Sequence, residues 1–438
     1  MTNQVSVPPM TASPSISVTD PTAPALNLLV RGGAHIFLTG RAGTGKTTLL
    51  RKFLDMSGKG AAVIAPTGVA AMNAGGQTIH SFFRLPPRLI EPHDIKRLRN
   101  ARLIKELKTL VIDEISMVRA DMMAAIDHSL RLHRDSAEPF GGVRMVLVGD
   151  LAQLPPIVDG EIAQYLDERF GGPFFFNAPV FREAGFLRVE LDTVFRQSDP
   201  DFIDILAGVR SGGLSQGEAA ILNERVTAAT GLDASATHVV LTPTNQAAHQ
   251  INAARLAGLP GDARGYNGKS EGQFDPRLFP TDDPLLLKPG ARVMMIRNDT
   301  SGRWVNGTMG EIDSLDDGAA YVRVGEDVHR VEPAAWERYR YAYDASKKSI
   351  ERDVVGAFKQ LPLKLAWAMT VHKSQGLTLD KVYIDFSRGM FAHGQAYVAL
   401  SRARTLEGLR LSRALIPRDL VMDPRIDDVR AYCHDAPI

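Results

Sequence analysis

Short apolar runs alternate with helical patterns along the first third of the chain. Each run ends in Gly, Pro or polar residues; the runs are HIFLTG, AAVIAPTG, LVIDEIS and VRMVLVGD. This alternation predicts a parallel sheet whose strands are separated by helices. Ligands of open α/β sheets bind at the carboxyl ends of the strands. The four strand ends therefore predict one site in this part of the chain.

A second set of runs predicts a second α/β core. It consists of LRVELDTVFRQ, HVVLTPTN, KVYIDF and GLRLSRA, with a helical pattern from Phe202 to Arg210. Between about Pro284 and Tyr343 the pattern changes to short, nearly alternating runs joined by Gly, Asp and Asn turns, which predicts a small antiparallel β-barrel. Because KVYIDF and GLRLSRA follow it, we expect an insertion in the second core. A surface insertion without a function is the alternative.

The predicted organisation has four parts. Residues 1–25 are rich in proline and lack an apolar period, so we expect a disordered tail. This tail has neither the basic start nor the apolar block of a signal peptide. The first core is expected at 26–195, the second at 196–283 and 344–438, and the inserted barrel at 284–343.

Composition narrows the class of protein further. The 438 residues include 51 Lys and Arg against 50 Asp and Glu, which excludes a uniformly basic surface and leaves local patches for polyanions. The single cysteine, Cys433, excludes a disulfide scaffold and indicates a reducing compartment. No run approaches the roughly 18 apolar residues of a membrane span. We therefore expect a cytoplasmic protein without a membrane partner, associated with the nucleoid if the cell is bacterial.

The octapeptide GRAGTGKT, at Gly40 to Thr47, matches the phosphate-binding pattern GxxxxGK[ST] between a strand run and a helical pattern. In such a loop, backbone N–H groups surround phosphates, Lys46 brings a cation to the β and γ oxygens, and the Thr47 hydroxyl reaches Mg²⁺. A Gly-rich turn without a ligand is the alternative. The nucleotide-binding residues predicted in this segment are Gly40, Ala42, Gly43, Thr44, Gly45, Lys46, Thr47 and Thr48.

Two acids and a glutamine follow the later strand runs. Asp113 and Glu114 come directly after LVI, where Asp113 is suited to hold Mg²⁺ and Glu114 to accept a proton from an attacking water. Gln153, in GDLAQLPP, could contact the γ-phosphate or orient that water. The alternatives are a solvated acidic pair and a turn residue before two prolines.

Seven segments, in order, resemble the petite-integration-frequency (PIF) family of superfamily 1B DNA helicases, which are related to RecD-type helicases. The resemblance spans about Ala34 to Leu411, and the stretch from Arg119 through Gly142 to Pro156 is similar to the one that separates this family from RecD-type helicases. The segments are GRAGTGKT, APTGVAAMNAGGQTIHSFF, DEISM, FGGVRMVLVGDLAQLPPI, FRQSDPDF, WAMTVHKSQGLTLD and YVALSRA.

The resemblance implies a fold and an activity. The fold is α/β, with two RecA-like P-loop NTPase cores that have parallel sheets and hold ATP between them, and an SH3-like β-barrel inserted in the second core. The activity is ATP-dependent movement along single-stranded DNA in the 5′ to 3′ direction, which unwinds duplexes in DNA repair, recombination or telomere and genome maintenance. ATP and Mg²⁺ are the implied cofactors. Single-stranded DNA and forked DNA are the implied partners, with single-stranded-DNA-binding protein or repair factors as further ones.

The resemblance also implies roles for residues. Arg196 and Arg402 match arginines that reach the γ-phosphate, which makes the catalytic set Lys46, Glu114, Gln153, Arg196 and Arg402, with Thr47 and Asp113 at the metal. In HKSQG, Gln375 and Gly376 are expected at the nucleotide. Surface ion pairs and a solvated loop are the alternatives, and Phe82 or Phe83 could equally belong to the core. The implied DNA-binding residues are Pro66, Thr67, Gly68, Thr78, His80, Phe82, Arg303, Trp304, Asn306, His372 and Lys373.

One segment and one absence modify this interpretation. Arg84 to Lys108 holds eight basic residues against three acidic ones. The family has a small insertion near the point of strand separation here, although a charge run is more often a solvated face. The family's glutamine upstream of the P-loop, which recognises adenine, is not evident. Selectivity for the base therefore stays open.

Two other functions remain as alternatives. A nucleotide-dependent binding protein without hydrolysis would not need Glu114, Gln153 and Arg196 together, so their joint presence favours hydrolysis. A RecD-like subunit would rely on a nuclease partner, because this sequence shows no nuclease cluster of its own beyond the ATPase acids.

Overall fold

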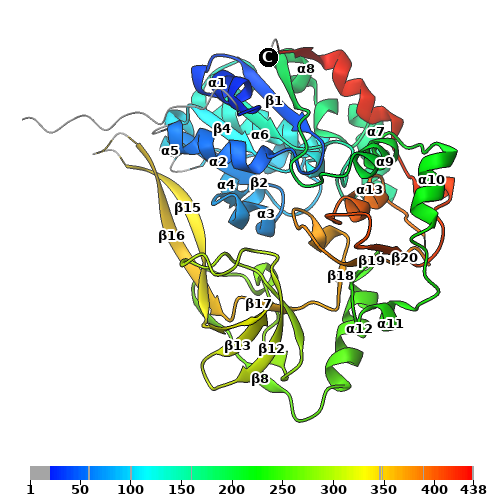
Figure 1. Cartoon of the computed structure of the whole chain (residues 1–438). Helices are drawn as coiled ribbons and strands as arrows, with labels where there is room; N and C mark the ends of the chain where they lie inside the picture. The colour runs from blue at the N-terminus through cyan, green and yellow to red at the C-terminus, as the bar shows by residue number, and fades with distance from the viewer. Residues whose placement is uncertain are drawn as a thin grey trace, which may run out of the picture.

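The structure is a computed structural model of the chain (Figure 1). It describes residues 20–57, 60–98, 101–158, 160–344, 347, 349–387 and 389–436. In this part of the chain, no helix is long and apolar enough to cross a membrane.

The first core is built on a parallel seven-stranded sheet in the order β21-β6-β1-β5-β4-β2-β3. The four runs predicted first form β1, β2, β4 and β5, as expected, whereas the edge strand β3 was not predicted. The strands are β1 (His35–Gly40), β2 (Ala61–Ala65), β3 (Gln77–Thr78), β4 (Thr109–Ile112), β5 (Arg144–Val148), β6 (Phe186–Leu191) and β21 (Cys433–Asp435). Its helices are α1 (Ala23–Arg31), α2 (Lys46–Met56), α3 (Gly68–Asn73), α4 (Ile79–Phe83), α5 (Arg102–Glu106), α6 (Ala120–Arg134), α7 (Gly160–Phe170) and α8 (Pro179–Ala184).

Apolar residues at helical spacing fix α1 and α2 on this sheet. Leu49, Leu50 and Phe53 of α2 are buried in one cluster with Leu26 and Leu29 of α1. The predicted boundary of the disordered tail at residue 25 is therefore too late, because α1 begins before it and packs on the core. The remainder of that predicted tail, residues 1–19, lies outside the described residues.

The second core has a parallel four-stranded sheet in the order β18-β7-β19-β20. The run LRVEL does not belong to it: it forms β6, which pairs with β1 in the first sheet. The helix predicted over Phe202 to Arg210 is present as α9. The elements are α9 (Pro200–Arg210), α10 (Gln216–Asn223), α11 (Gly231–Ala234), β7 (Val239–Thr242), α12 (Asn245–Ala257), β18 (Ala368–Thr370), β19 (Val382–Ile384), α13 (Gln395–Leu400) and β20 (Leu409–Leu411).

The segment inserted between α12 and β18 is antiparallel and larger than predicted (Figure 1). Five strands pair in the order β14-β13-β12-β11-β17, and a long hairpin, β15-β16, pairs with β9. Residue 344 and residues 349–365 therefore belong to the insertion rather than to the second core, and β21 adds a strand from near the C-terminus to the first sheet. The strands are β8 (Arg264–Tyr266), β9 (Lys269–Gly272), β10 (Leu285–Leu287), β11 (Arg292–Met295), β12 (Met309–Leu315), β13 (Ala320–Val324), β14 (Asp327–Val331), β15 (Ala334–Asp344), β16 (Ser349–Gln360) and β17 (Leu363–Leu365).

The hairpin reaches from the insertion to the first core (Figure 1). The Val63 N–H donates to the Tyr341 hydroxyl at 3.1 Å, and the Gln77 side chain donates to the Tyr339 carbonyl at 2.7 Å. The Tyr341 ring also lies edge-on to Phe82. The insertion contacts the second core as well, because Arg292 donates to the Ser235 carbonyl at 3.0 Å. It therefore lies against both cores.

Candidate functional site

The loop between β1 and α2 has the backbone shape of a phosphate-binding loop. Gly43 and Gly45 have φ angles of 82° and 83°, which glycine adopts at little cost, and α2 begins directly after them at Lys46. Lys46 Nζ donates to the Gly40 carbonyl at 2.6 Å and to the Arg41 carbonyl at 2.9 Å. Residues 42–48 line a cavity of about 600 Å³, which is large enough for a nucleotide.

Two carboxyl groups face this loop from the end of β4. Burial raises the pKa of Asp113, and burial together with the neighbouring Asp113 raises the pKa of Glu114 to about 7. Glu114 has a left-handed backbone conformation, with φ 51°, which is uncommon outside glycine and concentrates at functional sites. A carboxyl whose pKa lies near neutral pH is suited to accept a proton from water.

A chain of amide hydrogen bonds joins Glu114 to the second core. Gln375 Nε2 donates to Glu114 Oε2 at 3.0 Å and to Gln153 Oε1 at 3.2 Å. Gln153 Nε2 in turn donates to Asp150 Oδ2 at 3.3 Å, and Arg210 lies 3.2 Å from the other oxygen of Asp150. Gln153 thus lines the cavity beside Glu114, as predicted, while Gln375 contacts the catalytic candidates rather than the loop itself.

Both predicted arginines, Arg196 and Arg402, line the cavity at Lys46. Arg196 donates to the Ser401 carbonyl at 3.1 Å. It also packs closely against the loop, because a Cβ at Gly43 would lie only 2.6 Å from the Cβ of Arg196. Arg402 is 1 % exposed and donates to the Val398 carbonyl at 2.8 Å and to the Ser401 hydroxyl at 2.7 Å. Burial lowers the pKa of both guanidinium groups, that of Arg402 to about 9, so an added negative charge would stabilise them.

The residues predicted at the metal fit a hard cation. Thr47 and Asp113 line the cavity on either side of Lys46, and hydroxyl and carboxylate oxygens are the ligands that Mg²⁺ prefers when it also binds phosphates. Among the described residues, no group of three or more His, Cys, Asp or Glu side chains is arranged to hold a metal ion.

A groove of about 500 Å³ runs between the second core, the insertion and α3. The predicted residues Asn306 and Lys373 line it, and so does Gln375. Gln375 therefore contacts the groove on one side and Glu114 on the other. His372, next to Lys373, is half-buried, and burial lowers its pKa.

Two aromatic residues predicted to stack on bases are buried instead. Phe82 is 6 % exposed and packs with Phe83, so both phenylalanines belong to the core. Trp304 is 7 % exposed inside the insertion's own core. Arg303 lies over the Trp304 ring at 4.4 Å and forms an ion pair with Asp299 at 2.7 Å, so its charge is already partly neutralised.

The other residues predicted at DNA surround two short helices of the first core. Thr67 accepts a hydrogen bond from Ala70 N–H at the start of α3, and Thr78 accepts one from Ser81 N–H at the start of α4. These contacts use the hydroxyls as helix caps. The half-buried neighbours Pro66, Gly68 and His80 complete this set.

The basic segment from Arg84 to Lys108 is largely irregular and carries several ion pairs. Arg88 pairs with Asp94, and Arg97 and Lys105 pair with Asp135. The segment lies against the hairpin through α5. Part of its charge is therefore balanced within the molecule, and its contact with DNA stays a prediction.

Sequence reasoning missed several residues of the site. Trp336, Lys364 and His249 line the groove but stand in no recognisable motif. Tyr397 accepts a hydrogen bond from Ala42 N–H at 2.8 Å, so α13 supports the phosphate-binding loop from behind. Phe195 is 58 % exposed, and its ring lies 3.7 Å from the position that a Cβ at Gly45 would take. Its position next to Arg196 in the FRQ motif could have indicated that it belongs to the site.

Comparisons with known proteins agree with this geometry. A family model described as PIF1-like helicase matches residues 26–216, and one described as Helicase matches residues 361–417. The ATP-dependent DNA helicase Pif1 of Bdellovibrio bacteriovorus is 34% identical over 418 residues, which cover 92% of this chain and 89% of that protein. The chain spans 60% of the length of the human ATP-dependent DNA helicase PIF1, to which it is 35% identical over 417 residues.

Solved structures are similar over nearly the whole chain. Bacteroides sp Pif1 in complex with ADP-AlF4 has a TM-score of 0.87 and 37% identity, covering 95% of this chain and 97% of that one. Bacteroides Pif1 bound to ssDNA has the same identity and coverage with a TM-score of 0.68.

Proposed function

The chain belongs to the PIF1-like helicase family of ATP-dependent DNA helicases, and we propose that it moves 5′ to 3′ on single-stranded DNA and unwinds forked duplexes. One solved relative is in complex with ADP-AlF4, and another is bound to ssDNA. For this chain we assign the nucleotide to the cavity at Lys46 and single-stranded DNA to the groove at Lys373.

Hydrolysis proceeds through the residues around Glu114. Gln153 holds a water molecule in line with the γ-phosphorus, and Glu114 takes a proton from that water as its oxygen bonds to phosphorus. The bond from phosphorus to the oxygen bridging the β and γ phosphates then breaks, which leaves ADP and phosphate. Lys46, Arg196 and Arg402 offset the negative charge that moves onto the oxygens.

Mg²⁺ would be held by the Thr47 hydroxyl and, through water, by Asp113. When bound, this ion neutralises charge on the β and γ oxygens. The buried position of Asp113 next to Glu114 supports this division of roles, because a nearby cation keeps one carboxylate ionised while the other takes the proton.

The nucleobase stacks on Phe195. Its ring is largely exposed and lies beside Gly45 at the start of α2, and its N–H donates to the Gly43 carbonyl at 2.9 Å. A phenyl ring attracts every base through its face but reads no hydrogen-bond pattern. Residues 20–45, which lead into the loop, contain no glutamine, and this arrangement supports weak selectivity among nucleotides.

The observation that carries the proposal is the position of Gln375. It lies on the groove next to Lys373 and donates to both Glu114 and Gln153. A strand of DNA that moves Lys373 or Gln375 therefore changes the surroundings of the proton acceptor directly. This contact supports coupling between DNA binding and hydrolysis.

Steady-state ATP hydrolysis with and without single-stranded DNA tests the proposal. DNA should stimulate turnover strongly, and Glu114→Gln should remove the stimulated rate. Duplexes with a single-stranded tail at either the 5′ or the 3′ end then test direction, and only the 5′-tailed substrate should be unwound. An absence of stimulation by any nucleic acid would contradict the proposal.

DNA repair and recombination are the processes in which we place this activity, since forked DNA and exposed single strands arise there. Single-stranded-DNA-binding protein and repair factors are the further partners we propose. The cytoplasm, at the nucleoid of a bacterial cell, is the compartment that these partners require.

A further inference from the structure

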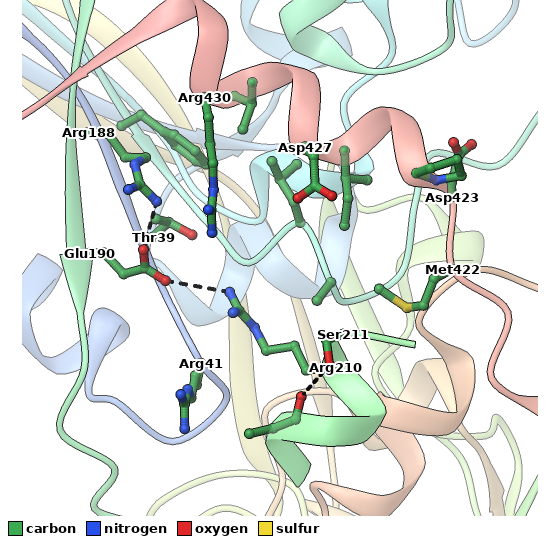
Figure 2. A pocket seen from close by; sticks show the side chains of 17 residues that line it. Thr39, Arg41, Arg188, Glu190, Arg210, Ser211, Met422, Asp423, Asp427 and Arg430 are labelled. Atoms are coloured by element: carbon green, nitrogen blue, oxygen red, sulfur yellow. Dashed lines mark hydrogen bonds and ion pairs between the residues drawn. The ribbon is translucent and has the colours of Figure 1, made fainter. Parts of the chain in front are cut away.

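A second polar cavity lies behind the phosphate-binding loop (Figure 2). It has a volume of about 330 Å³, and its walls come from β1 and β6, from α9, and from the segment Pro424–Tyr432 near the chain end. Residues 42–48 face the nucleotide cavity, whereas the neighbouring Arg41 lines this one. The loop is thus a wall shared by two cavities.

The lining of this cavity is rich in guanidinium groups. Arg41, Arg188, Arg210 and Arg430 line it from four different segments, together with Glu190 (Figure 2). Glu190 lies 2.7 Å from Arg188 and 3.8 Å from Arg210. Asp423 and Asp427 also line the cavity, and Asp423 forms an ion pair with Arg425 at 2.7 Å. Glu190 is therefore the carboxylate that serves two of the four arginines.

Several donors on this wall have no acceptor among the residues that the structure describes. Nε of Arg210 is buried without a hydrogen-bond partner among the described residues, and such a group is costly unless something satisfies it. Within the same part of the chain, the guanidinium groups of Arg41 and Arg430 donate no hydrogen bond. Guanidinium groups bind phosphate and carboxylate oxygens through paired N–H donors.

We propose that this cavity is a second ligand site, separate from the nucleotide site, that takes a small multivalent oxyanion such as pyrophosphate or a phosphate ester. Its volume is at the lower end of the range for small-molecule sites. Arg41 and Arg430, whose guanidinium groups donate no hydrogen bond to the described residues, provide the donors from two separate segments of the lining.

The cavity is also connected to the hydrolytic residues. Arg210 lies 3.2 Å from Asp150, which accepts hydrogen bonds from Ala152 N–H at 3.2 Å and from Gln153 Nε2 at 3.3 Å. An oxyanion that draws Arg210 toward itself weakens this ion pair and releases the support of Gln153. We therefore expect the occupied site to slow ATP hydrolysis.

Calorimetric titration of the full chain with pyrophosphate tests the site, after ADP and aluminium fluoride have filled the nucleotide site. Pyrophosphate should bind with one-to-one stoichiometry, and Arg430→Ala should weaken binding about tenfold or more, because one charge-assisted contact is lost. The matched variant Arg169→Ala, which removes an exposed arginine outside the cavity, should bind as the wild type does. Lys46→Ala without nucleotide should also retain binding, so the test does not depend on helicase activity.

Two further measurements identify the ligand class and the connection. Titration with citrate in place of pyrophosphate separates a general oxyanion site, which binds both, from a phosphate site, which binds pyrophosphate alone. At saturating ATP, pyrophosphate should slow turnover of the wild type at about tenfold lower concentration than in Arg430→Ala. The proposed site would be wrong if pyrophosphate did not bind to the enzyme filled with ADP and aluminium fluoride, or if Arg430→Ala bound it as tightly as the wild type. If pyrophosphate bound but left ATP turnover unchanged, the connection to hydrolysis would be wrong.

Discussion

The amide of Gln375 donates a hydrogen bond to the carboxylate of Glu114 at 3.0 Å, although 261 positions separate them in the sequence. The bond joins the end of β4 in the first core to the segment after β18 in the second. Any relative motion of the two cores changes its length. Because Glu114 is the proposed proton acceptor, this one contact makes hydrolysis depend on how the cores are placed.

Gln375→Ala should separate DNA binding from hydrolysis. Without the amide, Glu114 loses a donor that orients its carboxylate, so DNA should stimulate ATP turnover about tenfold less, while the rate without DNA changes little. The measurement is turnover against the concentration of single-stranded DNA. Gln164→Ala, which removes an exposed glutamine on α7, is the matched control. Undiminished stimulation in Gln375→Ala would place the coupling elsewhere.

The pH dependence of turnover should report the Glu114 carboxyl. Its pKa is raised to about 7 by burial and by Asp113. Above this pH the carboxylate accepts a proton from water, and below it the protonated form does not. Because kcat/KM reports groups of the free enzyme, kcat/KM should fall about tenfold per pH unit below pH 7. Glu114→Gln lacks this group, so its residual turnover should show no such step. A wild-type profile that is flat between about pH 5.5 and 8 would exclude this carboxyl as the proton acceptor.

Local pattern was sufficient to predict which residues gather at the loop after β1, because the shape of that loop is local. Glycine positions, a strand before them and an amphipathic helix after them determine the loop at Lys46, and the acids at 113 and 114 follow a buried strand whose carboxyl end faces it. The prediction of Gln153 rested on the same rule. These residues lie around one cavity in the structure.

The aromatic residues were predicted wrongly because burial is not local. Phe82 and Trp304 occupy sequence positions that suit base stacking, yet they are covered by residues far away in the chain, Tyr341 and the strands of the insertion respectively. The extent of the insertion was missed for a related reason. Hairpin β15-β16 pairs Ala334–Asp344 with Ser349–Gln360, whereas the predicted boundary fell between residues 343 and 344, inside β15.

Phe195→Ala should weaken the binding of all nucleotides by a similar factor. Stacking of a base on an aromatic ring contributes about 1–3 kcal/mol, which corresponds to about 5- to 150-fold in KM or Kd. ATP, GTP and CTP should each lose affinity, because the ring reads no base-specific pattern. Competition of the three nucleotides for the wild type and the variant measures this. A loss confined to ATP would show that another residue recognises adenine.

Two tryptophans should respond in opposite ways to substitution. Trp336 lines the groove, so Trp336→Ala should weaken single-stranded DNA binding by about 1–3 kcal/mol and leave the free energy of unfolding nearly unchanged. Trp304 is buried, so Trp304→Ala should lower the free energy of unfolding by about 3–5 kcal/mol. Fluorescence titration with DNA and denaturant unfolding measure the two effects. The reverse result would restore Trp304 as the stacking residue.

Lys364 should make DNA binding depend on pH in the mildly alkaline range. It lines the groove, and burial together with the nearby Lys373 lowers the pKa of its ammonium group to about 8. The group is therefore charged below pH 8 and largely neutral above it, whereas an ordinary lysine stays charged to above pH 10. DNA affinity should fall as the pH rises from about 7 to 9, because one cation that contacts phosphate is lost.

Lys364→Met retains the length of the side chain without its charge. This variant should bind DNA more weakly at pH 7, show no such step with pH, and have a dependence on log salt concentration that is shallower by about one unit. Lys269→Met, at an exposed position on β9, should keep the wild-type step. If the DNA affinity of Lys364→Met still fell between about pH 7 and 9, a group other than Lys364 would be the one that titrates. The prediction would then be wrong.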